Sequence, residues 1–264
     1  MPLGFGLLRR AAITRRAFCH TAGSKECIDF TTITSSENSV VLWDSATVYR
    51  SKINLDENAN AKLTKVAVKK FHSRFPRNGS VPRSSANNAF FMEQSGYMRH
   101  TPPGDVVCDI ALASFLKLSE FQTLLDCIKP KVLQYFNSEG YNVMTRGSDG
   151  ETTVVLVPQI LCWASVHYGG SHHEPHNHLS STADVSGVYY SQVPDDAGQL
   201  VFFNSDASTG EIIEPKEMCA VAPQEGDVIL FPPWLTHSVR TTKGLEDNPR
   251  VSFAFNVHFR QMFH

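Results

Sequence analysis

Long apolar runs and basic stripes are both missing from this sequence of 264 residues. A membrane helix needs roughly 18 or more consecutive apolar residues, whereas the longest apolar runs here have the length of a strand. The formal net charge is -2, and no basic stripe with interleaved aromatic residues predicts a nucleic-acid groove or a surface for anionic lipids. We therefore expect no membrane span and no nucleic-acid partner, while the oligomeric state stays open.

Paired cysteines are also missing, since no C-x-x-C motif occurs among the six cysteines. They are scattered along the chain at Cys19, Cys27, Cys108, Cys127, Cys162 and Cys219. Such scatter favours reduced, unpaired thiols over a disulfide framework or a zinc knuckle. We expect a reducing compartment.

Acidic residues are absent from positions 1–25, where arginines lie among Leu, Ala, Phe, Ser and Thr. This composition is typical of an organellar transit peptide. The segment also resembles the mitochondrial two-step cleavage pattern, with Arg16 two residues before Phe18 and Thr21 three residues after it. We expect residues 1–25 to be a mitochondrial transit peptide, cleaved near Glu26, that directs the protein to the matrix. A basic tail without a targeting role, on a cytoplasmic protein, is the alternative.

Residues 26–150 predict an N-terminal elaboration of strands and two helices. The first helix carries a one-sided apolar pattern formed by Ala59, Leu63, Val66, Ala67 and Phe71. The second begins near Ser119, which could form a capping box with Gln122. Between them, residues 78–103 are rich in Ser, Asn, Arg and Pro and predict a loop. Apolar helix stripes are usually packing surfaces, so we expect both helices to support the outside of a sheet.

The sequence of residues 151–264 predicts a β-rich domain. Short strand-like runs separated by turn residues occupy positions 152–157, 160–168, 185–193, 200–203, 228–231, 239–242 and 251–259. Several short strands at this spacing favour an antiparallel sandwich or barrel. The fold class is therefore mainly β.

Six of the eleven histidines form two groups inside this β region: His167, His172, His173, His176 and His178 before the run 185–193, and His237 after the run 228–231. Residues i and i+2 of an extended strand point to the same side, so His176 and His178 can direct two imidazoles at one point. His237, from a neighbouring strand, can supply a third ligand. Three ligands on one face of a metal leave positions open for substrate and oxygen, as metal catalysis requires.

The last strand predicts a polar face and an apolar face. Arg250, Ser252, Ala254 and Asn256 alternate with Val251, Phe253, Phe255 and Val257. An arginine that points into a barrel needs an anion, and its planar guanidinium suits a carboxylate that the Ser252 hydroxyl could also bind. A surface salt bridge of Arg250 on an edge strand is the alternative.

The order of the motifs in this region resembles that of the Fe(II)- and 2-oxoglutarate-dependent dioxygenases. The motifs are H-x-H at 176–178, SGVYY at 186–190, GQLVFF at 198–203, FPPWLTHSV at 231–239 and RVSFAFN at 250–256. They are most similar to a subfamily with the pattern H-x-H, SGVYY, G-x-L-x-F, FP-x-W-L-x-H-x-V and R-x-S-x-x-FN. The resemblance covers roughly residues 155–258.

This resemblance implies a double-stranded β-helix, or jelly roll, supported by N-terminal α-helices. It implies that His176, His178 and His237 bind Fe(II), and that Arg250, together with Ser252, binds the co-substrate 2-oxoglutarate. The implied reaction consumes O2, converts 2-oxoglutarate to succinate and CO2, and hydroxylates a substrate that the sequence does not identify.

His178 departs from the superfamily pattern, in which the second ligand is usually Asp or Glu. Three neutral imidazoles leave the full +2 charge on Fe(II), which should strengthen the binding of a dianionic co-substrate. A different alignment takes His172-His173-Glu174 as H-x-E and makes Glu174 a ligand. Asp184 is a weaker candidate.

Two other functions stay open at this point. One is a three-histidine, cupin-type dioxygenase that does not use 2-oxoglutarate, for which Arg250 would have no role. The other is a non-catalytic jelly-roll binding protein, which would not consume oxygen with iron and 2-oxoglutarate. The sequence does not establish whether the chain is catalytically active.

Overall fold

The computed structural model describes residues 28–29, 37–42, 46–74, 89–93, 118–141, 144–146, 153–243 and 248–263. The expected transit peptide, residues 1–25, lies outside these ranges. None of the helices within them is long and apolar enough to cross a membrane.

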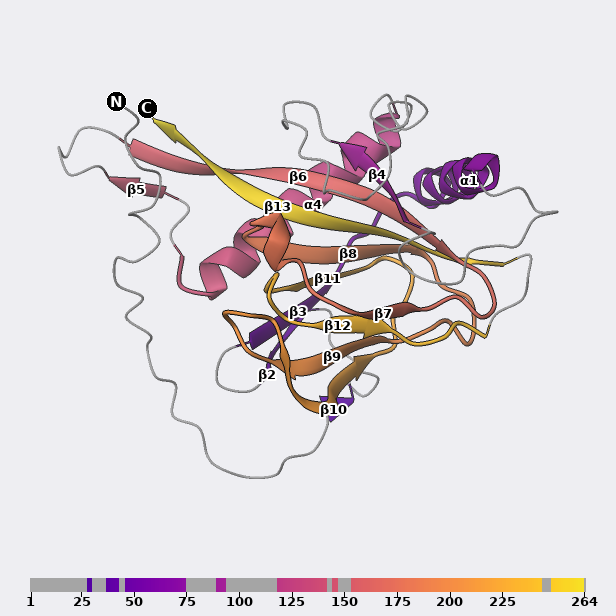
Figure 1. Cartoon of the computed structure of the whole chain (residues 1–264). Helices are drawn as coiled ribbons and strands as arrows, with labels where there is room; N and C mark the ends of the chain where they lie inside the picture. Colours follow the sequence, from indigo (N-terminus) through magenta and orange to yellow (C-terminus); the bar gives the residue numbers. More distant parts are fainter. Residues whose placement is uncertain are drawn as a thin grey trace.

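The strands form two sheets (Figure 1). The larger sheet has the order β2-β3-β11-β8-β13-β6-β4, with β5 paired to β6. Its strands are β2 (Glu37–Leu42), β3 (Ala46–Lys52), β4 (Ala89–Glu93), β5 (Met144–Arg146), β6 (Thr153–His167), β8 (Val185–Gln192), β11 (Asp227–Phe231) and β13 (Arg250–Phe263). The smaller sheet has the order β1-β10-β9-β12-β7. Its strands are β1 (Ile28–Asp29), β7 (His173–His176), β9 (Leu200–Ser205), β10 (Ile212–Val221) and β12 (His237–Val239).

The path of the chain from β6 to β13 is that of a double-stranded β-helix. Successive strands alternate between the larger and the smaller sheet, except that β9 and β10 are neighbours in the smaller one. Among the described pairings, only that of β1 with β10 is parallel. The predicted mainly β fold and jelly roll are therefore confirmed.

The helices, the larger sheet and the smaller sheet form three layers with an apolar core between each pair of neighbouring layers. The first core joins the helices α1 (Glu57–Arg74) and α4 (Ser119–Ser138) to the larger sheet, and it includes the apolar face of β13 (Figure 1). The second core lies between the two sheets and includes Val188, Phe202, Ile229 and Phe231. The helices thus support the outer face of the larger sheet, as predicted, and leave the polar face of β13 for the interior of the jelly roll.

Some local predictions were wrong. The runs 152–157 and 160–168 form the single strand β6, because β13 pairs with it continuously across Pro158. Strand β4 occupies part of the expected loop 78–103 and pairs with β6. Helix α4 has Leu118 as its N-cap and no side-chain capping bond, so the predicted capping box of Ser119 does not form.

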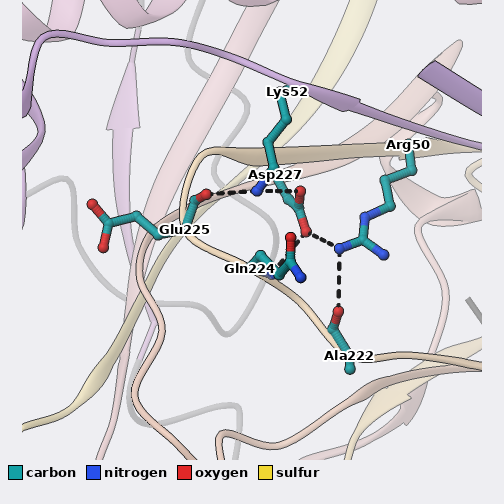
Figure 2. A network of polar contacts seen from close by, with 6 residues as sticks. All are labelled: Arg50, Lys52, Ala222, Gln224, Glu225 and Asp227. Carbon is teal, nitrogen blue, oxygen red and sulfur yellow. Dashed lines mark hydrogen bonds and ion pairs between the residues drawn. The ribbon is translucent and has the colours of Figure 1, made fainter. Parts of the chain in front are cut away.

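A buried carboxylate ties β3 to β11 at the start of the latter strand (Figure 2). Arg50 Nη2 donates to Asp227 Oδ2 at 2.6 Å, and Lys52 Nζ lies 3.0 Å from Oδ1. The backbone N–H of Gln224 donates to Oδ2 at 2.7 Å. The Asp227 side chain is 1% exposed, and two cations together with a backbone N–H balance its charge.

Candidate metal centre

Three histidines, two from paired strands of the smaller sheet and one from the turn after the first of these strands, converge on one point. Strand β7 ends at His176, β12 begins at His237, and these two residues are direct register partners. His178 follows β7 by two residues. One ligand nitrogen from each of the three rings lies within 4.8 Å of the other two. The ring centroids are 4.4 Å apart for His176 and His237, 5.1 Å for His178 and His237, and 5.4 Å for His176 and His178.

His176 and His178 were expected to converge because alternate residues of a strand share a face, but the structure shows a different cause. His178 does not continue the strand, because its φ of -115° and ψ of 21° lead into the short 3-10 helix Leu179–Ser181. Its backbone N–H donates to Pro233 O at 2.7 Å, which anchors this turn to the segment before β12. The turn after β7, rather than strand alternation, brings the His178 ring beside that of His176.

The Nδ1 atoms of His176 and His237 form hydrogen bonds with backbone carbonyls. His176 Nδ1 donates to Glu174 O at 2.7 Å, and His237 Nδ1 donates to Leu235 O at 2.9 Å. A carbonyl can only accept, so each Nδ1 carries the hydrogen and each Nε2 keeps its lone pair. This tautomer is the one that a metal-binding imidazole needs.

The His178 ring is held by two side chains of the larger sheet. Its Nδ1 lies 2.8 Å from Asn256 Oδ1 and 2.9 Å from Ser186 Oγ. The Ser186 hydroxyl donates its hydrogen to Asn256 Oδ1 at 2.8 Å and therefore cannot donate it to the ring. His178 Nδ1 is then the donor, and Asn256 Oδ1 accepts its hydrogen. The three-histidine donor set therefore fits a divalent metal, with three oriented Nε2 atoms and open positions opposite them.

Burial keeps the three rings neutral. It lowers the pKa of His178 to about 3, with the neighbouring His176 as the second cause. Burial also lowers the pKa of His176, and it lowers that of His237 to well below the usual value. A neutral imidazole is the form that binds metal, so protons compete with the metal only under acidic conditions.

The two carboxylates considered as alternative ligands lie elsewhere. Glu174 Oε1 is 2.7 Å from His172 Nε2, and the Glu174 side chain is 69% exposed. Asp184 Oδ2 accepts the backbone N–H of Phe259 at 2.8 Å. Within the described ranges, the cluster that the structure brings together consists of three histidines and contains neither acid.

Arg250 is a buried cation with no anionic partner in the part of the chain that the structure describes. It begins β13, which lies between β8 and β6, and it is 2% exposed, so the alternative of a surface salt bridge on an edge strand is wrong. Arg250 Nη2 is 3.3 Å from the Tyr190 hydroxyl and Nη1 is 3.5 Å from Ser252 Oγ, while Nε has no partner. The guanidinium carbon lies 4.9 Å from the centre of the Tyr190 ring. No carboxylate of the described residues pairs with Arg250.

A histidine pair lies between Arg250 and the three converging rings. His167 is the cross-strand partner of Arg250, and its Nε2 lies 3.0 Å from His173 Nε2. The centroid of the His173 ring is 5.7 Å from that of His176. The sequence placed both residues in the histidine-rich region but assigned them no role, because their contact depends on how β6 and β7 meet in space.

Comparisons with known proteins agree with the motifs. Residues 161–256 match the family model described as "Putative 2OG-Fe(II) oxygenase". This segment runs from β6 into β13 and contains the three converging histidines and Arg250. The match confirms the resemblance to oxidoreductases that use Fe(II), 2-oxoglutarate and O2. None of the curated proteins matches the chain.

Several solved structures are similar at low sequence identity. A prolyl hydroxylase from Trichoplax adhaerens, solved with a peptide fragment of the hypoxia inducible factor oxygen degradation domain, has 14% identity and a TM-score of 0.45, covering 80% of this chain and 82% of its own. A prolyl-4-hydroxylase from Pseudomonas putida has 12% identity and a TM-score of 0.43, covering 79% and 91%. An oxidoreductase of the 2OG-Fe(II) oxygenase family from Burkholderia pseudomallei has 12% identity and a TM-score of 0.36, covering 85% and 74%. Likeness at this level carries no information about the substrate.

Proposed function

We propose that this chain, a 2OG-Fe(II) oxygenase by its family match, is an Fe(II)- and 2-oxoglutarate-dependent dioxygenase that hydroxylates a C–H bond and releases succinate and CO2. His176, His178 and His237 bind Fe(II). Arg250, with the Ser252 hydroxyl, binds the distal carboxylate of 2-oxoglutarate. The observation that carries this proposal is a buried guanidinium with no carboxylate partner among the described residues, on the same histidine-lined interior as three oriented imidazoles.

The guanidinium is the strongest argument for an anionic co-substrate. Buried charges in proteins are normally paired, because desolvation of an isolated ion is costly. Arg250 instead has two hydroxyl partners and the face of an aromatic ring. These contacts fix the orientation of the guanidinium and leave its charge available to a ligand carboxylate, with which it can form two parallel hydrogen bonds.

Tyr190 adds a second donor at the same place. Burial raises the pKa of its phenol, which therefore keeps its proton. The hydroxyl accepts from Arg250 Nη2, so its own hydrogen is free to point at a bound carboxylate. The residues around Arg250 thus orient the carboxylate of the co-substrate.

The three neutral imidazoles set the charge of the metal site. When bound, Fe(II) supplies the redox chemistry that couples O2 reduction to decarboxylation of 2-oxoglutarate. A histidine ligand contributes no negative charge, so this donor set leaves the full charge of the ion to attract a dianion. The hydrogen bonds to Leu235 O, Glu174 O and Asn256 hold the rings in the orientation that ligation requires.

The proposed activity is tested by anaerobic reconstitution with Fe(II), addition of O2, and measurement of succinate with and without candidate substrates. We expect uncoupled succinate formation that disappears in His237→Ala and in Arg250→Ala. Glu174→Gln is the matched control and should keep the activity, because Glu174 is exposed and lies outside the cluster. Full activity in Arg250→Ala would remove the co-substrate assignment. Oxygen consumption that does not depend on 2-oxoglutarate would favour the cupin-type alternative.

A further inference from the structure

We propose that β6 supplies a second wall of the co-substrate pocket, in which Ser165 and a neutral His167 donate hydrogen bonds to the carboxylate held by Arg250. His173 is the positioning residue that places the His167 hydrogen on Nδ1. The identity of the anion rests on the proposed function, whereas the polar wall itself rests on contacts and burial of this chain.

The wall follows from strand register. Ser165 and His167 of β6 are the direct partners of Ser252 and Arg250 of β13. Cross-strand partners project from the same face of a sheet, so these four side chains form one polar patch. The apolar residues between them belong to the core on the helical side of the sheet. The patch therefore lines the interior of the jelly roll.

Three polar atoms of this patch are buried without a partner: Ser165 Oγ, His167 Nδ1 and Arg250 Nε. Their residues are 1%, 0% and 2% exposed, respectively. Buried polar groups are hydrogen-bonded in the large majority of cases. Three orphaned atoms on two adjacent strands, next to an uncompensated cation, point to one missing polar ligand rather than to three separate defects.

The contact between His167 and His173 determines which hydrogen His167 can offer. Their Nε2 atoms are 3.0 Å apart, so one of them must carry a hydrogen and the other must accept it. If His173 is the donor, neutral His167 accepts at Nε2 and carries its hydrogen on Nδ1. The opposite arrangement would leave a lone pair on Nδ1 facing the anion, which is unfavourable. Burial and the charge of Arg250 hold the pKa of His167 well below its usual range, so the ring stays neutral.

This arrangement also favours a carboxylate over a phosphate. Arg250 contributes one positive charge to the patch, while the serines and the neutral His167 contribute donors without charge. One carboxylate balances that single charge and can accept several hydrogen bonds. A phosphate dianion would remain partly uncompensated in a buried site.

A matched pair of substitutions separates the two nitrogens of His167. The side-chain amide nitrogen of His167→Asn takes the place of Nδ1, and that of His167→Gln takes the place of Nε2. We would titrate 2-oxoglutarate into the full chain loaded with Zn(II) and measure its affinity by calorimetry. We expect His167→Asn to bind within about threefold of the wild type, and His167→Gln to bind about tenfold more weakly, as for the loss of one buried hydrogen bond. His172→Gln, a control outside the wall, should bind like the wild type.

A second readout does not depend on any substitution. Nitrogen NMR of the Zn(II)-loaded protein reports which ring nitrogen of His167 carries the hydrogen, and we expect Nδ1 when 2-oxoglutarate is bound. In His173→Leu this preference should be lost, and His173→Gln, which keeps a donor at the Nε2 position, should restore it.

The outcomes distinguish this inference from the proposed function. Wild-type affinity in His167→Gln, or a hydrogen on Nε2 of His167 in the complex, would overturn the role of the β6 wall. The co-substrate assignment would stand in that case, provided that Arg250→Met still abolishes binding. A wild-type protein that does not bind 2-oxoglutarate would overturn both.

Discussion

Asp227 and Arg250 are both buried charges that begin strands of the larger sheet, and each has one side-chain atom without a hydrogen-bond partner, Asp227 Oδ1 and Arg250 Nε, but the two differ in the charges around them. Asp227 lies between two cations, Arg50 and Lys52, and also accepts a backbone N–H (Figure 2). Arg250 has only two hydroxyl groups and an aromatic face, and its Nε is unpartnered. Among the described residues, Asp227 has partners of opposite charge and Arg250 has none.

The difference distinguishes a structural ion pair at Asp227 from the proposed binding site at Arg250. Removing one partner of a buried ion pair leaves an uncompensated charge and costs about 3–5 kcal/mol. A fold that holds an uncompensated guanidinium already carries part of such a cost, which a bound anion would recover. Asp227 should therefore affect stability, and Arg250 should affect ligand binding.

The largest expected effect is on stability at Asp227. Asp227→Asn keeps the shape but removes the charge between Arg50 and Lys52. We expect the free energy of unfolding to fall by about 3 kcal/mol, at the lower end of the range because Lys52 can reach water. Chemical denaturation measures this change. Asp126→Asn, in the exposed pair with Lys129, is the control and should leave the free energy of unfolding unchanged. The comparison would fail if the two variants were equally stable.

Arg250→Met should show the opposite behaviour. Loss of one partner of a buried, hydrogen-bonded charge pair costs about 2–5 kcal/mol, so 2-oxoglutarate should bind about 100-fold more weakly or not at all. Without ligand, the variant should be at least as stable as the wild type, because methionine fills the site without an unpaired charge. Calorimetry and denaturation of the metal-loaded and metal-free protein test the two parts. Arg260→Met, an exposed site on the same strand, is the control. If Arg250→Met lost stability but bound 2-oxoglutarate like the wild type, Arg250 would be a structural residue and not a ligand-binding one.

Asn256 is expected to affect metal binding, because it orients one of the three converging histidines. Its Oδ1 accepts from His178 Nδ1, and no cation is part of that contact. Asn256→Ala should lower the metal affinity about 10-fold to 100-fold, as is typical for groups that orient a ligating histidine. Asn256→Asp keeps an acceptor at this position and should lower it less. Competition with a chelator measures the affinities, and equal values for Asn256→Ala and the wild type would exclude this role.

The smallest expected effect is the difference in the pH dependence of stability between His178→Asn and the wild type from pH 7 to pH 5. The buried rings of the metal centre have lowered pKa values, whereas an unfolded histidine titrates near 6.5. Below that pH the unfolded state binds more protons than the folded state, so the free energy of unfolding of the metal-free protein should fall as the pH drops. The loss begins near pH 6.5, reaches at most about 1.4 kcal/mol per pH unit for each histidine, and for His178 ends near its folded pKa of about 3. In the presence of a chelator, the free energy of unfolding of His178→Asn should change less steeply with pH than that of the wild type between pH 7 and pH 5. An unchanged slope would show that the buried His178 ring does not cause the pH dependence.

Local patterns predicted much of the candidate site. Strand alternation in β13 placed Arg250 on the opposite face from Phe253, and the distribution of the apolar core confirmed this. The H-x-H motif and the later His237 named the three rings that converge, although a turn rather than a strand presents His178. The residues that converge could therefore be named from local motifs, whereas the local geometry at His178 could not.

Contacts between distant segments were not predictable in the same way. The pairing of β3 with β11 brings Arg50 to Asp227, and the meeting of β6 with β7 brings His167 to His173. Such contacts depend on register and on the packing of two sheets, which no local pattern contains. The transit peptide and the boundaries at residues 25 and 150 stay predictions.

The most direct test of the comparison is a crystal structure grown under nitrogen with Fe(II) and 2-oxoglutarate. We expect the metal on the Nε2 atoms of His176, His178 and His237, a carboxylate of the co-substrate on Arg250, and no change around Asp227. A metal bound elsewhere, or a guanidinium that still lacks an anion in the presence of saturating 2-oxoglutarate, would contradict the account.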